Sequence, residues 1–142
     1  MLKTLTDDIL VAPQISVADI EEAKALGVTL VINNRPDHES PDQPEGTDIE
    51  AAARTAGMDY VAIPVTHAGF SAWQLDATEK ALEGAQGKVL AFCRSGTRST
   101  LLWALTRARA GENCDKLSAT AARAGYDLTS VRPMMDALSA GR

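Results

Sequence analysis

The chain has 142 residues, 45% of them hydrophobic and 23% charged, and its formal net charge is −5 at pH 7. A chain of this length suits one domain with one core, and we expect residues 1–142 to form it. The acidity and the lack of a Lys- or Arg-rich tract argue against nucleic acid as a partner, because binding to phosphates needs clustered cations.

The sequence predicts a cytoplasmic protein without a membrane partner. Asp7 and Asp8 stand where a signal peptide needs its apolar region, and no apolar run approaches the ~20 residues that span a bilayer. The two cysteines, Cys93 and Cys114, make no disulfide framework, and the two histidines are far apart. We therefore expect no metal and no other cofactor. The sequence does not determine an oligomeric state.

The first half of the chain begins with two predicted strands and the helix between them. Apolar side chains alternate in ILVAPQIS, residues 9–16, which predicts the first strand. Ser16, with Asp19 three residues on, is a capping pattern and predicts that a helix starts there. TLVINN, residues 29–34, is a short run rich in β-branched residues and predicts a buried strand. The Pro- and acid-rich stretch 33–46 predicts a long surface loop.

The same alternation continues further along the chain. Thr47 and Glu50 form a capping pattern that predicts the next helix, and DYVAIPV, residues 59–65, predicts a third strand. Ser71 and Gln74 repeat the capping pattern before another helical stretch.

The last part of the chain contains one more predicted strand and three helices. KVLAFC, residues 88–93, predicts the fourth strand, and the stretch 99–111 has helical spacing. Two further helices are expected around 114–124 and 130–139. Strand and helix thus alternate four times, which predicts an α/β fold: three layers, with a mostly parallel four- to five-stranded sheet and helices on both faces.

Ligands bind at the carboxyl ends of the strands in such sheets. Three segments follow strand ends and turn abruptly polar: NNRPDH at 33–38, THAGFS at 66–71 and CRSGTRS at 93–99. We expect a functional site where these segments meet.

The loop CRSGTRS has the composition of an oxyanion site. Gly96 permits a positive φ, so that backbone N–H groups of the loop and of the following helix can point inward. Arg98 adds a planar, bidentate donor, and Cys93 lies where cations and a helix N-terminus favour the thiolate, which is a nucleophile. Ser99 is placed to donate a hydrogen bond to the sulfur. The expected substrate-binding residues are Arg35, Arg94, Ser95, Gly96 and Thr97.

Several stretches together resemble one known family. QIS, VINNRPD, AARTAGMDYVAIPV and FCRSGTRSTLLW are similar to the beta-lactamase-hydrolase-like protein, phosphatase-like domain family, over about residues 8–108. This resemblance implies a fold like that of dual-specificity phosphatases, with a cysteine phosphatase-like loop. It also implies chemistry described for the family both as phosphatase-like hydrolysis and as sulfur transfer.

The chain departs from the dual-specificity phosphatase pattern in two places. Its loop has the spacing C-x4-R, one residue shorter than in those phosphatases and the same as in many rhodanese-like proteins. Their Asp general acid, soon after the strand that corresponds to residues 59–65, is replaced by Thr-His-Ala-Gly. His67 or Asp37 can supply the proton instead. Arg35 either extends the positive field or pairs with Asp37.

Three functions follow from these residues. The first is a cysteine-dependent phosphatase-like hydrolase, in which Cys93 attacks phosphorus. The second is a rhodanese-like sulfurtransferase, which forms a persulfide on the same cysteine. The third is a binding module for an oxyanion or phosphopeptide without turnover, although such a module needs no nucleophile. The expected partner is a small oxyanion: a phosphoester, thiosulfate or a persulfide. We adopt the first interpretation, with sulfur transfer as the alternative.

Overall fold

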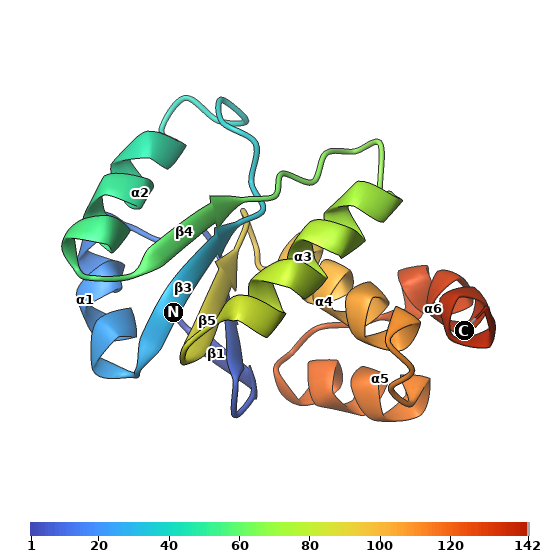
Figure 1. The fold of residues 1–142 in the computed structure, drawn as a ribbon. Coiled ribbons are helices and arrows are strands. Elements are labelled where there is room, and N and C mark those ends of the chain that lie inside the picture. Colours follow the sequence, from blue (N-terminus) through green and yellow to red (C-terminus); the bar gives the residue numbers. More distant parts are fainter. Residues whose placement is uncertain (142) are drawn as a thin grey trace.

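Five strands form one mixed sheet in the order β1-β2-β5-β3-β4 in the computed structural model, which describes residues 1–141 (Figure 1). The strands are β1 Lys3–Thr6, β2 Ile9–Ala12, β3 Val28–Asn33, β4 Asp59–Ala62 and β5 Lys88–Phe92. β1 runs antiparallel to β2, whereas the remaining neighbours are parallel. The predicted α/β fold with a mostly parallel sheet is confirmed.

Helices cover both faces of this sheet, which makes three layers (Figure 1). The helices are α1 Val17–Ala25, α2 Gly46–Thr55, α3 Ala72–Gly84, α4 Thr97–Arg109, α5 Cys114–Arg123 and α6 Arg132–Ala140, with a 3₁₀ turn at Thr129–Val131. α1 and α2 pack on one face through Ile20 and Ile49, and the other helices pack on the opposite face. Burial on both faces explains why β2, β3 and β5 are almost continuously apolar.

The strands differ from the prediction in two ways. β1 was not predicted, because its sequence KTLT has only one fully buried side chain, Leu5. β2 and β4 end earlier than predicted, at Ala12 and Ala62, shortly before Pro13 and Pro64. Proline has no N–H group to continue a ladder.

Two of the three predicted capping patterns are confirmed. Ser16 with Asp19, and Ser71 with Gln74, form capping boxes at the starts of α1 and α3. The prediction for Thr47 and Glu50 is wrong, since α2 begins at Gly46. The first N–H group of this helix instead donates to a carboxylate of the preceding loop, described below.

The C-terminal helices lie against α4, and α5 also contacts β1. Leu117 on α5 and Met135 on α6 are buried in the same core as α4 and the sheet. α5 begins at its predicted first residue and ends one residue early, and α6 begins two residues late and ends one residue late. This segment therefore covers part of the sheet and of α4.

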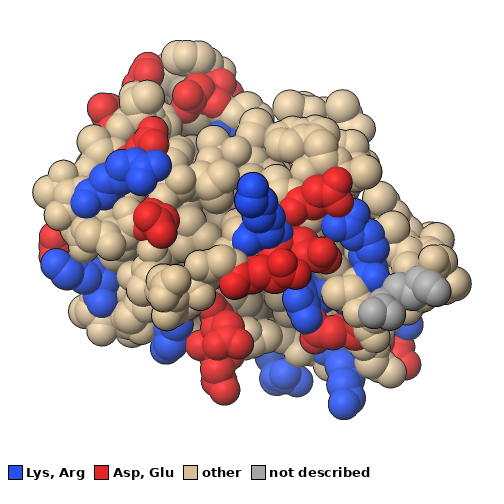
Figure 2. Space-filling model, viewed as in Figure 1, with Lys and Arg blue, Asp and Glu red and all other residues tan. Residues whose placement is uncertain are grey.

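The surface carries charges of both signs. On the face shown in Figure 2, Lys and Arg side chains are interspersed with Asp and Glu. Among the ion pairs of the structure, Arg109 on α4 pairs with Asp76 on α3 at 2.9 Å and lies 3.8 Å from Glu79. Within residues 1–141, none of the helices combines the length and the apolar character that crossing a bilayer requires.

Candidate active site

Cys93 lies directly after β5, at the carboxyl edge of the sheet, and begins the loop of residues 93–99 that leads into α4. Cys93 has no exposed surface. The N–H group of Gly96 donates a hydrogen bond to the Cys93 sulfur at 3.1 Å. Gly96 has φ = +91°, in the left-handed region, and is the N-cap of α4. The loop therefore curls back over the sulfur, with a backbone donor aimed at it.

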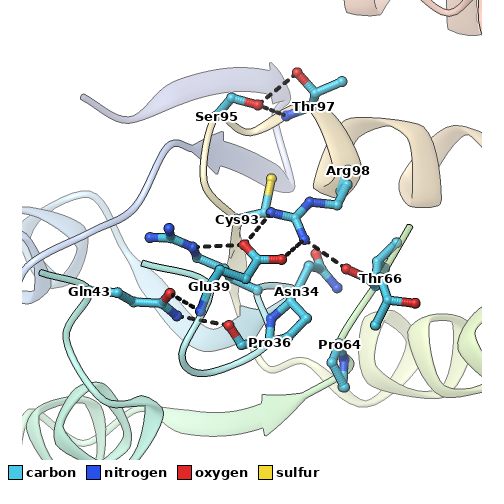
Figure 3. A network of polar contacts seen from close by, with 12 residues as sticks. Asn34, Pro36, Glu39, Gln43, Pro64, Thr66, Cys93, Ser95, Thr97 and Arg98 are labelled. Atoms are coloured by element: carbon cyan, nitrogen blue, oxygen red, sulfur yellow. Dashed lines mark hydrogen bonds and ion pairs between the residues drawn. The ribbon is translucent and has the colours of Figure 1, made fainter. Parts of the chain in front are cut away.

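Arg98 extends from the first turn of α4 toward an acidic side chain on the loop after β3 (Figure 3). Its Nη1 and Nη2 atoms donate to the two carboxylate oxygens of Glu39 at 2.7 and 2.8 Å. Nη1 also donates to the carbonyl oxygen of Val65, after β4, at 2.8 Å. The guanidinium thus connects the polar segments that follow three different strands.

Within residues 1–141, the hydrogen bonds from Arg98 to Glu39 and Val65 use only Nη1 and one hydrogen of Nη2. Glu39 occupies the end formed by Nη1 and Nη2, and Val65 takes the second hydrogen of Nη1. The hydrogens that remain, on Nε and Nη2, form the side edge, which can bind a planar or tetrahedral oxyanion with two parallel bonds. In Figure 3 the guanidinium lies between the Glu39 carboxylate and the Cys93 sulfur.

Glu39 is strongly perturbed by its two arginine partners. The hydrogen bond from Arg98 is the largest cause that lowers the pKa of Glu39 from 4.5 to about 2, and Arg35 lowers it further while burial opposes both. In turn, hydrogen bonding to Glu39 raises the pKa of Arg98, and a negative charge on Cys93 adds to this rise. Glu39 is therefore an anion and Arg98 a cation at neutral pH.

Arg35 is buried beside this pair rather than pointing at a ligand. Its Nε donates to Glu39 at 3.0 Å and its Nη1 donates to Gln14 Oε1 at 3.0 Å. The alternative prediction that Arg35 pairs with Asp37 is wrong, because the acidic partner of Arg35 is Glu39. Arg35 and Arg98 thus share the Glu39 carboxylate.

Asp37 and His67, the two candidate acids, occupy different environments. Asp37 Oδ1 accepts a hydrogen bond from the backbone N–H of Gly46 at 2.9 Å, and the Asp37 carboxylate therefore binds the first N–H group of α2. His67 is exposed in a short turn closed by Thr66 and Gly69. This turn begins next to Val65, whose carbonyl contacts Arg98.

Ser99 is not the sulfur's partner in this structure. Its hydroxyl donates to Asn34 Oδ1 at 2.8 Å, and Asn34 Nδ2 donates to the Ile63 carbonyl at 2.8 Å. Because a serine hydroxyl has a single hydrogen, the predicted hydrogen bond from Ser99 to the sulfur is absent. Ser99 instead links α4 to the ends of β3 and β4.

The other loop residues form the rim of the site. The Ser95 hydroxyl donates to the Thr97 hydroxyl at 2.9 Å and accepts from the Thr97 backbone N–H at 3.3 Å. The side chain of Arg94 is exposed, while its carbonyl accepts the backbone N–H of Gln14 at 3.2 Å. Arg94 therefore contacts the segment after β2 through its backbone.

Sequence reasoning missed two residues that touch the site. Glu39 lies in the acid-rich stretch 33–46 together with three other acidic residues, and its neighbours along the chain gave no reason to choose it. Tyr126 follows α5, and its hydroxyl donates to the Ser95 carbonyl at 3.0 Å. Only folding brings it beside Ser95, which lies 31 positions earlier in the chain.

Comparison with known proteins identifies the family of this chain. Residues 1–110 match the model of the family described as beta-lactamase hydrolase-like protein, phosphatase-like domain, and the chain belongs to this family. A beta-lactamase hydrolase-like protein from Agrobacterium fabrum is 36% identical over 107 residues, which are 75% of this chain and 25% of that protein. One from Xylella fastidiosa is 37% identical over 103 residues, 72% of this chain and 24% of that protein. The chain thus spans about a quarter of the length of these curated relatives.

Solved structures show that the fold is one used by phosphatases. The candidate phosphatase nma1982 from Neisseria meningitidis is 32% identical, with a TM-score of 0.85 over 96% of each chain. A candidate phosphatase from Shewanella putrefaciens is 26% identical, with a TM-score of 0.72 over 99% of this chain and 87% of that one. The PP-IP phosphatase SIW14 from S. cerevisiae, 11% identical with a TM-score of 0.70 over 95% of this chain and 83% of its core domain, shares the fold alone. The predicted family and the cysteine phosphatase-like fold are confirmed.

Proposed function

We propose that this chain is a cysteine-dependent phosphatase that acts on a small phosphoester. The observation that carries the proposal is the arrangement of Cys93 and Arg98 on one curled loop: a backbone N–H at 3.1 Å from the sulfur and a guanidinium edge left free beside it. The family and the fold, which solved phosphatases share, support the same class of reaction.

The proposed reaction has two steps. The Cys93 thiolate attacks phosphorus, and a sulfur–phosphorus bond forms while the ester oxygen–phosphorus bond breaks. The leaving oxygen takes a proton from a general acid. Water then attacks the cysteinyl phosphate, which releases inorganic phosphate and restores the thiolate. Arg98 and the loop N–H groups stabilise the negative oxygens in both steps.

Substrate access requires movement, because Cys93 has no exposed surface. Glu39 is an anion already bound to Arg98, and its side chain is 22% exposed. A phosphate that binds the free edge of Arg98 comes close to this carboxylate and is repelled by it. We infer that Glu39 moves aside when the oxyanion binds.

His67 is the general acid that we favour. Asp37 is engaged by the Gly46 N–H, whereas His67 is free to turn toward a leaving group. An alkyl phosphate needs a general acid, and an aryl phosphate with an acidic phenol needs little help. His67→Gln is therefore expected to lower turnover of the alkyl ester by roughly 10²–10⁴-fold and to spare the aryl ester. Equal loss on both esters, or on neither, excludes His67 from this role.

Sulfur transfer is the second candidate, favoured by the C-x4-R spacing and by the missing Asp. In that reaction Cys93 attacks the outer sulfur of thiosulfate, the sulfur–sulfur bond breaks, and sulfite leaves with the electron pair. A persulfide remains on Cys93 until a thiol accepts the sulfur.

Intact-protein mass spectrometry separates the candidates. The protein is incubated with an aryl phosphate or with thiosulfate, quenched in acid and weighed. A phosphoryl adduct with the first reagent supports the phosphatase, and an added sulfur atom with the second supports the sulfurtransferase. Neither adduct, together with binding of phosphate, supports the binding module. Cys93→Ser must abolish a thiol-bound adduct, and Cys114→Ser, which alters the other cysteine, must keep it.

A further inference from the structure

Tyr126 connects the C-terminal segment to the loop of the candidate active site. It lies between α5 and the 3₁₀ turn, its residue is only 8% exposed, and its hydroxyl donates to the Ser95 carbonyl at 3.0 Å. Residues 1–110 are those that the family model matches, so Tyr126 lies outside the matched region.

The Ser95 carbonyl and the Gly96 N–H belong to the same peptide unit. The structure contains no cis peptide bond among residues 1–141, so these two groups point in opposite directions across a rigid plane. The carbonyl end bonds to Tyr126, and the N–H end bonds to the Cys93 sulfur at 3.1 Å. Fixing one end of this plane fixes the other.

The phenol also fits closely against Gly96. A Cβ atom added to Gly96 would lie 2.1 Å from the Tyr126 hydroxyl oxygen and 2.9 Å from the adjoining ring carbon. The ring is further held by Lys3, whose Nζ lies 4.9 Å from the ring centroid. The phenol is thus a rigid support on the outer side of the loop.

The hydroxyl of Tyr126 can act only as long as it keeps its proton. Burial raises the pKa of Tyr126, and the charge of a nearby Cys93 thiolate raises it further. The phenol is therefore a hydrogen-bond donor throughout the neutral pH range.

We propose that Tyr126 is a positioning residue: its hydroxyl orients the Ser95–Gly96 peptide so that the Gly96 N–H faces the Cys93 sulfur and stabilises its thiolate. This proposal depends on the proposed function in one respect: it takes the Cys93 thiolate as the reacting group. Arg98 interacts electrostatically with Cys93, Glu39 is bonded to Arg98, and removing the phenol oxygen alters neither of these side chains.

Tyr126→Phe tests this proposal without any substrate. Two signals are followed by NMR: the amide resonance of Gly96, and the ¹³Cβ shift of Cys93 against pH, which reports the thiolate. In the variant we expect the Gly96 amide to move and the ratio of thiolate to thiol at a given pH to fall about two- to tenfold, as for the loss of one hydrogen bond.

Tyr60→Phe is the matched control, since these are the only two tyrosines. Tyr60 also loses a hydrogen bond, from Asn33 Nδ2 at 2.9 Å, and this bond involves no residue of the 93–99 loop. We expect this variant to leave the Gly96 amide and the Cys93 titration unchanged. If Tyr126→Phe leaves both signals unchanged, or if Tyr60→Phe moves them equally, Tyr126 only packs and the proposal is wrong. Failure of the phosphatase assay in the unmodified protein does not affect either signal, so the two proposals fail separately.

Discussion

Residues 1–110 and residues 111–141 differ in what they contribute to this molecule. The first region contains all five strands and the loop of Cys93 and Arg98, and it matches the family model. The second region contains α5, the 3₁₀ turn and α6, and it packs on α4 and β1. Yet the second region places the Tyr126 hydroxyl 3.0 Å from the loop carbonyl.

The proposed reacting groups and their support therefore come from separate parts of the chain. A short loop that must hold its N–H groups inward leaves its carbonyls pointing outward, where they need donors. The first region supplies the Cys93 sulfur, which accepts the inward N–H of Gly96, and the Arg98 guanidinium. The second region supplies one outward donor, Tyr126. Substitutions in the two regions are therefore expected to affect turnover and stability differently.

The largest expected effect falls in the first region. Arg98→Lys replaces a planar fork with a single ammonium, which cannot give two parallel bonds to an oxyanion. We expect turnover of an aryl phosphate to fall roughly 10²–10³-fold. Arg54→Lys, on the surface of α2, is the control and is expected to keep full turnover. Equal turnover of the two variants in a steady-state assay would remove Arg98 from the reaction.

A substitution in the second region is expected to reduce stability rather than turnover. Met135→Ala removes most of a side chain that has no exposed surface and leaves a cavity in the core. The free energy of unfolding should therefore fall by about 2–5 kcal/mol. The adjacent Met134→Ala, at 36% exposure, should change it far less. Urea unfolding measures both. Turnover per folded molecule should stay nearly constant, and a large loss there would show that α6 does more than support the core.

The smallest effect concerns the ion pair between two segments of the first region. Folding lowers the pKa of Glu39 from 4.5 to about 2, first through its hydrogen bond from Arg98. A carboxyl group with a lowered pKa stabilises the folded state above its unfolded pKa, and this contribution is lost as the pH falls from 4.5 toward 2. Glu39→Gln should therefore show a shallower fall of melting temperature over this interval than the unmodified protein.

Glu21→Gln, on the exposed face of α1, serves as the control for this pH series. It should follow the unmodified protein. If the melting temperature of Glu39→Gln also changes with pH as that of the unmodified protein does, the pair of Glu39 with Arg98 does not contribute to stability in solution.

Much of the fold was predictable because local patterns coincide with the tertiary arrangement. β3 and β5 are short, apolar and bounded by polar loops, and both predicted capping boxes of α1 and α3 are present. β1 was not predicted, since an edge strand of four residues with one buried side chain has no pattern of its own. The start of α2 was misplaced because its first N–H bonds to Asp37, nine residues earlier, and not to a local cap.

The site was predictable only where its residues are close in sequence. Cys93, Gly96 and Arg98 share one loop, and their spacing already indicates an oxyanion-binding turn. Glu39 and Tyr126 reach that loop from distant segments, and no local pattern marks either of them. Ser99 was given the wrong partner for the same reason, as Asn34 comes from another strand.

The alternation of strands and helices, the family, and the loop that carries the thiol can all be inferred from the amino-acid sequence. These features follow from residue spacing, which acts over a few positions along the chain. The acceptors of the Arg98 hydrogen bonds, the donor to the Ser95 carbonyl and the partner of Ser99 emerge from the folded arrangement alone. Hydrogen bonds depend on positions in space, and packing of the sheet and helices sets those positions after the local elements have formed.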